Sequence, residues 1–169
     1  MLRIVAQISL VLLVGVAAAG AEEFDPTSLD LAALIECRAD VPAYNGLAFW
    51  LSGEAGAAEK LGWKEVPAGN PFLPATVRVF GYETASIVFT ATGPLAALDG
   101  VSAPDLAREL GISPEVATPE KFLGEKIVVE SSEEADGMTF STRIGLNVST
   151  VDSHPGKVLA GCSYALDVN

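Results

Sequence analysis

The sequence predicts an α+β fold, in which helices pack on one face of a mostly antiparallel sheet of about five or six strands. The final third of the chain alternates between apolar and polar residues, a pattern typical of strands with one buried and one solvated face. The earlier part carries helix-capping residues and apolar side chains at helical spacing. We expect residues 22–169 to form one α+β domain, since this length is typical of a single domain.

Residues 1–21 have the pattern of a cleaved secretory signal peptide. Arg3 supplies the positive charge, residues 4–16 are almost entirely apolar, and small residues precede a cleavage point after Ala21 or, as second choice, after Ala19. The apolar run is too short to cross a membrane comfortably, because a spanning helix needs about 20 apolar residues. We therefore expect an exported protein without a membrane span after signal removal, periplasmic in a Gram-negative source and extracellular otherwise.

Two helices are expected at the start of the mature chain. The first begins near Asp25-Pro26, and either Asp25 or Thr27 can serve as its N-cap. The second begins after Asp40 and ends at Ser52-Gly53. Apolar residues at helical spacing give each of these segments a face that can pack on the sheet.

Two shorter helices share the same stop signal. Residues 57–61 are followed by Gly62-Trp63, and residues 107–110 by Gly111-Ile112. A glycine followed by an apolar residue is typical of a Schellman motif. Ser102 is the expected N-cap of the second of these helices.

A Pro-rich connection follows each short helix, over residues 66–75 and 113–124. In the second connection, Ser113-Pro114-Glu115 and Thr118-Pro119-Glu120 each predict a single helical turn. Helix, connection and hairpin thus recur from about residue 57 and from about residue 107. Two interpretations stay open, a duplicated helix–loop–hairpin unit and a chance similarity of common α+β elements.

Six segments are expected to be strands: residues 76–80, 85–91, 95–98, 126–130, 138–148 and 158–168. The last two have apolar residues at every even position except Thr142, which predicts that the even-numbered side chains face the helices. Residues 133–137 and 152–156 are the expected turns around them.

The chain has two cysteines, Cys37 near the first helix and Cys162 on the buried face of the last strand. In an oxidising compartment an even pair of cysteines indicates a disulfide. Such a bridge would contribute about 4–5 kcal/mol in the chain-entropy model. The alternative is two unpaired, buried thiols.

The formal net charge is −12, and loss of Arg3 with the signal peptide would make it one unit more negative. A chain this acidic repels the phosphates of nucleic acids and of anionic lipids, so we expect no nucleic-acid partner. The charge favours a protein partner with a basic surface. The alternative is that it only keeps an exported protein soluble.

The sequence contains no catalytic or metal-binding constellation, and we expect no cofactor and no metal. His154, the only histidine, lies in a turn sequence, where neither packing nor a third group would hold it for catalysis. The acidic run of residues 130–137 lacks the ligand spacing of a calcium loop and is interpreted as a charged hairpin tip.

Aromatic residues around the first Pro-rich connection form the candidate binding site. The aromatic residues are Trp63, Phe72 and Tyr82, and the apolar Leu73 belongs to the same candidate site. Prolines reduce the entropy that a loop loses on binding, and aromatic side chains often anchor protein partners. The alternative is that Phe72 and Leu73 close the end of the core while Trp63 completes the Schellman contact.

These observations favour a non-enzymatic exported binding module, whose partner could be a basic protein. A carrier of a small apolar ligand, held between helices and sheet, is the first alternative, because the many alanines and glycines could leave space there. A small hydrolase that uses two carboxylates is the second. Sequence does not determine the oligomeric state.

Overall fold

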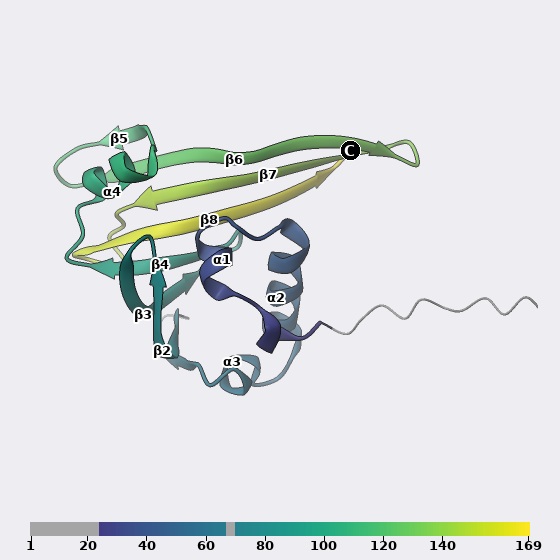
Figure 1. Ribbon diagram of the computed structural model, residues 1–169, viewed down its shortest axis with the longest axis horizontal. Helices are drawn as coiled ribbons and strands as arrows, with labels where there is room; N and C mark the ends of the chain where they lie inside the picture. The colour runs from purple at the N-terminus through teal and green to yellow at the C-terminus, as the bar shows by residue number, and fades with distance from the viewer. Residues whose placement is uncertain (1–23, 67–69) are drawn as a thin grey trace, which may run out of the picture.

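Figure 1 shows the computed structural model, which describes residues 24–66 and 70–169. The expected signal peptide, residues 1–21, and residues 67–69 of the first Pro-rich connection lie outside the described residues. The described chain is mixed α+β and consists mostly of sheet. None of its helices is long and apolar enough to cross a membrane.

The helical elements lie in the first two thirds of the chain. They are the 3₁₀ turn η1 (Pro26–Ser28) and the helices α1 (Leu31–Ile35), α2 (Val41–Gly53), α3 (Ala57–Lys60) and α4 (Ala103–Leu110). The strands are β1 (Lys64–Val66), β2 (Asn70–Val79), β3 (Tyr82–Phe89), β4 (Pro94–Asp99), β5 (Pro114–Ala117), β6 (Phe122–Ala135), β7 (Met138–Ser149) and β8 (Lys157–Val168).

The eight strands of the described residues form one sheet in the order β1-β2-β3-β4-β8-β7-β6-β5, and every neighbouring pair is antiparallel. The expected count of five or six strands was therefore too low. The six predicted segments all overlap strands, and the two additional strands, β1 and β5, are short. The last strand, β8, lies between β4 and β7 and is therefore an interior strand of the sheet (Figure 1).

The first predicted helix is split in two. Asp25 accepts a hydrogen bond from the Thr27 amide at 2.9 Å and caps η1, whereas Thr27 caps nothing. Leu29 then returns to extended backbone, and Asp30 starts α1 by accepting from the Ala33 amide at 3.0 Å. The prediction of one continuous helix was wrong because Asp30 is a second N-cap inside it.

The other helix signals are confirmed. Asp40 caps α2 through the Ala43 amide, and Ser102 caps α4 through the Asp105 amide. After α3 and α4, Gly62 and Gly111 both adopt the left-handed conformation. The next residue then donates its amide to a carbonyl of the last helical turn, which is the predicted Schellman motif.

Two predictions for the second half were wrong. Residues 114–117 form the edge strand β5 instead of a helical turn, and Pro114 is tolerated there because an edge strand can lack one donor. Residues 133–135 belong to β6 instead of a turn. The turn itself is only Asp136-Gly137, where both residues have positive φ, as a two-residue hairpin of type I′ requires.

Side chains from α1, α2 and α4 share one buried cluster with the even-numbered side chains of β7 and β8. The strands contribute Ile144, Leu146, Val148, Val158, Ala160, Cys162 and Tyr164 to it. The even-numbered side chains of β7 from Ile144 to Val148 are buried as predicted. Strict alternation was wrong there, because the odd-numbered Gly145 and Ser149 are buried as well. On β8 the odd-numbered Leu159 and Gly161 are buried as well, since β4 pairs there. The duplication of a helix–loop–hairpin unit stays a prediction.

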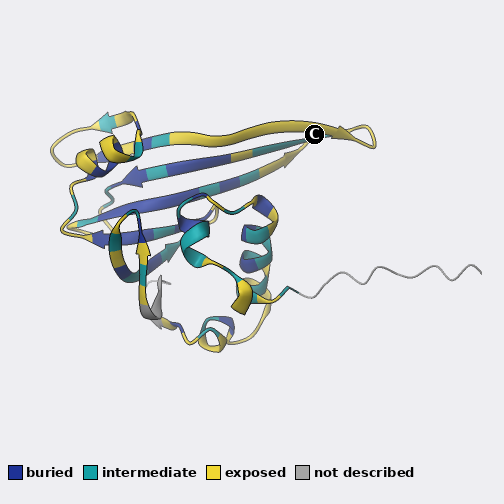
Figure 2. Ribbon diagram, in the orientation of Figure 1, coloured by how far each residue is buried: buried dark blue, intermediate teal, exposed yellow. Residues whose placement is uncertain are grey.

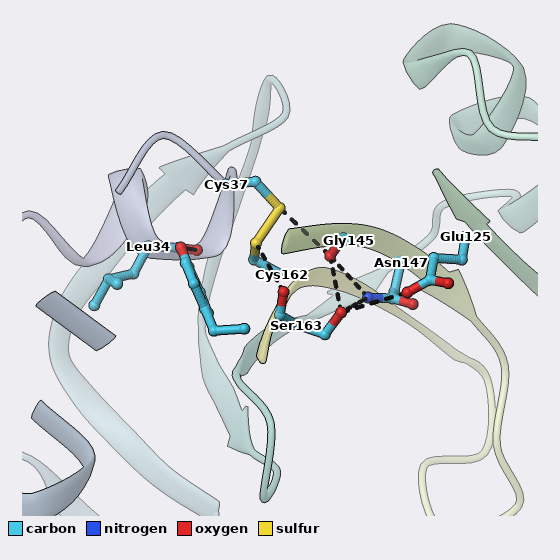
Figure 3. The surroundings of a disulfide bond; sticks show 8 residues. Leu34, Cys37, Glu125, Gly145, Asn147, Cys162 and Ser163 are labelled. Carbon is cyan, nitrogen blue, oxygen red and sulfur yellow. Dashed lines mark hydrogen bonds between the residues drawn. A yellow bond between two sulfur atoms is a disulfide. The ribbon is translucent and has the colours of Figure 1, made fainter. Parts of the chain in front are cut away.

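The structure contains the predicted disulfide between Cys37 and Cys162, whose Cα atoms are 5.2 Å apart (Figure 3). It joins the residues that follow α1 to the middle of β8. Cys37 has a positive φ of 58°, so the chain turns sharply after α1 and directs this side chain at the sheet. The bridge therefore fixes the N-terminal helices to the central strand.

Candidate functional site

The hairpin of β6 and β7 extends beyond the helices, toward the end of β8 (Figure 1). We call this region the distal arm and define it as residues 129–142 together with residues 165–168. Almost all of β6 from Lys126 onward is exposed, on both faces of the sheet (Figure 2). The distal arm is thus a part of the sheet that no described helix covers.

One long edge of the arm is open. On one side β6 pairs with β7 along its whole length, from Leu123 to Ala135. On the other side β5 pairs only with the first three residues of β6, ending at Gly124. Within the described residues no strand occupies this side of residues 129–135. We call these seven positions the free edge; at about 3.4 Å per residue they span about 20 Å.

The inner face of the distal arm is largely apolar, although Ser131, Glu133 and Thr142 also lie on it. Val129, Met138, Leu166 and Val168 are between 39% and 52% exposed. Their positions in the strand register place them on the face that carries the core further along the same strands. The apolar face of the sheet therefore continues past the helices into solvent. Exposed apolar surface of this kind often marks an interaction site.

The arm also carries a strong negative charge. Five acidic residues lie on it, namely Glu130, Glu133, Glu134, Asp136 and Asp167. The sequence has no Lys or Arg between Glu130 and Thr142. The nearest cation along β7, Arg143, is paired with Glu125 at 2.7 Å. The arm thus combines exposed apolar side chains with a local excess of carboxylates.

Of the candidate binding residues selected from the sequence, the structure describes the side chains of Trp63 and Tyr82. Trp63 is only 8% exposed and stacks on Phe89, with ring centroids 5.6 Å apart. Tyr82 is partly buried and packs against the core. Phe72 and Leu73 lie on β2, but their side chains are outside the described part of the structure. Trp63 therefore contributes to packing, and a binding role for Phe72, Leu73 and Tyr82 stays a prediction.

A polar groove of about 450 Å³ lies on the sheet between Thr92 and Arg143. Its polar groups bond to one another: Asn147 donates to the Gly145 carbonyl at 3.0 Å, and Ser163 donates to the same oxygen at 3.2 Å (Figure 3). The Ser163 hydroxyl is 3.5 Å from Glu125, whose carboxylate is already held by Arg143. The polar side chains of this groove thus bind one another.

His154 lines a second open cleft, of about 600 Å³, together with Glu120 and Asp152. Its Nδ1 atom is 3.0 Å from the hydroxyl of the adjacent Ser153, in the turn between β7 and β8. No group of three or more His, Cys, Asp or Glu side chains among the described residues is placed to hold a metal ion.

Comparisons of the chain with family models, with curated proteins and with solved structures find no match. The function is therefore inferred from the geometry of this chain alone.

Sequence reasoning missed the distal arm as a surface. It interpreted residues 130–137 as a hairpin tip, although the dipeptide Asp136-Gly137 is a strong signal for a two-residue turn. A turn at that position, joined to an alternating strand of residues 138–148, requires a partner strand of similar length. The long β6 could have been predicted from these two signals together.

Proposed function

We propose that the protein is an exported, non-enzymatic binding module and that its partner is a protein with a basic surface. The observation that supports this proposal is the distal arm, where uncovered apolar side chains and unpaired strand backbone coincide with five acidic residues. Complementary charge increases the rate of association and selects among partners. The disulfide and the predicted signal peptide are consistent with function in an oxidising compartment.

The proposal is tested with a variant of the arm and a control of equal net charge. The arm variant carries Glu130→Gln, Glu133→Gln and Glu134→Gln. The control carries Glu59→Gln, Glu109→Gln and Glu115→Gln, all at exposed positions away from the arm. Binding of poly-L-lysine to both variants and to the unchanged protein is measured by isothermal titration at low and at high salt.

We expect the arm variant to bind poly-L-lysine about tenfold more weakly than the control variant at low salt, because its carboxylates are clustered and the others are dispersed. Equal losses in the two variants would mean that only the net charge matters. That result would contradict the arm as the binding surface.

A carrier of a small apolar ligand is the alternative with some structural support. An open apolar hollow of about 260 Å³ lies between α2 and β3, lined by residues that include Tyr44, Leu51 and Phe89. It is slightly smaller than the ligand sites typical of proteins, about 300–1,000 Å³. The glycines that suggested a cavity have another explanation, because a Cβ on Gly93 or Gly161 would overlap the backbone of a neighbouring strand. These glycines permit close packing, so the binding module remains the preferred proposal.

The hydrolase alternative has less support. In the polar groove the carboxylate nearest to a hydroxyl, Glu125, is engaged by Arg143. In the cleft beside His154 the imidazole lies on an exposed turn. Catalysis by an activated nucleophile needs a hydroxyl or thiol held against a base, and in the groove the Ser163 hydroxyl is 3.5 Å from a carboxylate that Arg143 already binds.

A further inference from the structure

We propose that the partner binds as an extended cationic segment that adds a strand to the sheet along the free edge of β6. This proposal rests on the proposed function and specifies how the basic partner is recognised. Strand addition supplies main-chain hydrogen bonds, and the side chains on alternate positions supply specificity.

The direction of the backbone groups on β6 follows from hydrogen bonds at the end of the sheet. Thr139 and Asn169 exchange two backbone hydrogen bonds, of 2.8 and 3.0 Å, so the amide and carbonyl of Thr139 point toward β8. Those of the next residue, Phe140, therefore point toward β6, where its partner in the register is Glu133. Successive residues of a strand point their backbone groups to opposite sides.

Glu133 and Ser131 consequently bond to β7, whereas Glu130, Ser132 and Glu134 direct their amides and carbonyls away from it. No described strand meets these outward groups. The free edge therefore presents three donors and three acceptors, spaced for a partner strand. Unpaired backbone groups of this kind form a template for strand pairing.

A second copy of this chain is a poor occupant of the free edge. An antiparallel pairing of two free edges that uses all seven positions is centred on Ser132. It places Glu130 of each copy directly opposite Glu134 of the other. Like charges at directly opposite positions destabilise a pair of strands. The carboxylates thus protect the edge against self-association, as charged residues on edge strands generally do.

The same carboxylates favour a cationic strand. Glu130 and Glu134 are four positions apart on one strand, so their side chains lie on the same face, about 13 Å apart. A Lys or Arg opposite each of them requires two cations at the same four-residue spacing in the partner. The partner is therefore an extended segment with cations at positions i and i+4. The residue midway between these cations lies opposite Ser132.

The test uses a blocked threonine peptide of about nine residues that carries two lysines four positions apart. A second peptide is identical except for methyl groups on the backbone nitrogens of both lysines. The methyl groups keep the charges but remove the donors that would face Glu130 and Glu134.

Two protein variants complete the test. Ser132→Pro removes an outward donor and leaves the bonds to β7 intact, and Ser132→Ala keeps that donor; both lose the hydroxyl contact with Ser141.

We expect the unmodified peptide to bind the unchanged protein and the Ser132→Ala variant with equal affinity. Methylation of the peptide, or Ser132→Pro, should weaken binding about tenfold or more, because backbone hydrogen bonds are lost while the charges remain. The two peptides are also compared on the unchanged protein. That comparison does not depend on whether the Ser132→Pro variant folds.

Equal binding of both peptides would overturn strand addition. So would the absence of peptide binding to a protein whose arm carboxylates still bind poly-L-lysine. In either case the arm would remain a basic-partner surface and only the mode of recognition would be wrong. If neither peptide binds and the arm variant also matches its control with poly-L-lysine, both proposals are contradicted.

Discussion

The hydroxyl of Tyr164 on β8 donates a hydrogen bond of 2.7 Å to the carbonyl oxygen of Leu34 in α1. Tyr164 is buried, and its ring stacks on Tyr44 of α2 with centroids 5.0 Å apart. It lies two residues from Cys162, so a covalent bond and a buried hydrogen bond join the N-terminal helices to the same strand. Strand β8, whose last residues belong to the distal arm, is thereby fixed at its middle.

We predict that Tyr164→Phe lowers the free energy of unfolding by about 1 kcal/mol, because it removes a buried hydrogen bond while keeping the ring. The measurement is urea unfolding followed by far-ultraviolet circular dichroism. Tyr82→Phe, at a partly buried position on β3, is the matched control and should change stability by less than about 0.5 kcal/mol. Equal effects of the two substitutions would contradict the assigned role of the Tyr164 hydroxyl.

Alkaline pH should destabilise the fold through the same residue. Burial, with a smaller contribution from the charge of Asp40, raises the pKa of Tyr164 well above its ordinary value of 10.0. The unfolded chain therefore loses this proton at a lower pH than the folded chain does. The contribution of Tyr164 to the free energy of unfolding is therefore fully present below pH 10.0. It decreases as the pH rises above that value.

The free energy of unfolding, measured between neutral pH and pH values above the ordinary tyrosine pKa, should therefore decrease less steeply for Tyr164→Phe than for the unchanged protein. Identical slopes would mean that Tyr164 titrates normally in the folded state. Burial also raises the pKa of Tyr44, so a smaller dependence on pH should remain in the variant.

Removal of the disulfide should be costly. The double variant Cys37→Ala and Cys162→Ala opens a loop between residues 125 positions apart. We expect it to lower the free energy of unfolding by about 2–5 kcal/mol. Denaturant unfolding of this variant, and of the unchanged protein with and without a reducing agent, measures the effect. A change below about 0.5 kcal/mol would contradict a structural role for the bridge.

Two glycines should respond in opposite ways to alanine. A Cβ on Gly93 would overlap the carbonyl oxygen of Cys162, whereas a Cβ on Gly53 at the end of α2 would have no atom within 4 Å. Gly93→Ala should therefore destabilise the protein by about 1–3 kcal/mol or more. Gly53→Ala should be neutral or stabilise it by up to about 1 kcal/mol. Thermal unfolding of both variants measures the difference, and equal effects would argue against close packing of β4 on β8.

The helix boundaries could be predicted from the sequence because their signals are local. The disulfide could be predicted because the chain has only two cysteines. Asp40, Ser102 and the two Gly-apolar stops act within one helical turn, so their effect does not depend on the rest of the fold. The two cysteines permit only one intramolecular pairing. The alternation of β7 is also a local pattern, and it correctly identified the buried even-numbered side chains from Ile144 to Val148.

The length of β6 was not accessible in the same way. Glu and Asp have low strand propensity, so residues 130–135 resemble a turn when considered alone. They form a strand because β7 offers a continuous row of backbone partners up to Ala135. β5 was missed for a similar reason, since Pro114 is typical of a helix start and becomes part of a strand only through pairing with Gly124. Pairing with a neighbouring strand outweighed local propensity in both segments. The first of them, residues 130–135, belongs to the distal arm.

Amide hydrogen exchange along β6 tests the strand-addition account most directly. In the free protein the amides of Glu130, Ser132 and Glu134 should exchange rapidly, and those of Ser131 and Glu133 slowly, because only the latter bond to β7. Addition of the two-lysine peptide should slow exchange at the three outward amides, while the methylated peptide should not. Exchange that does not alternate in the free protein, or outward amides that stay unprotected when the peptide is bound, would contradict the account.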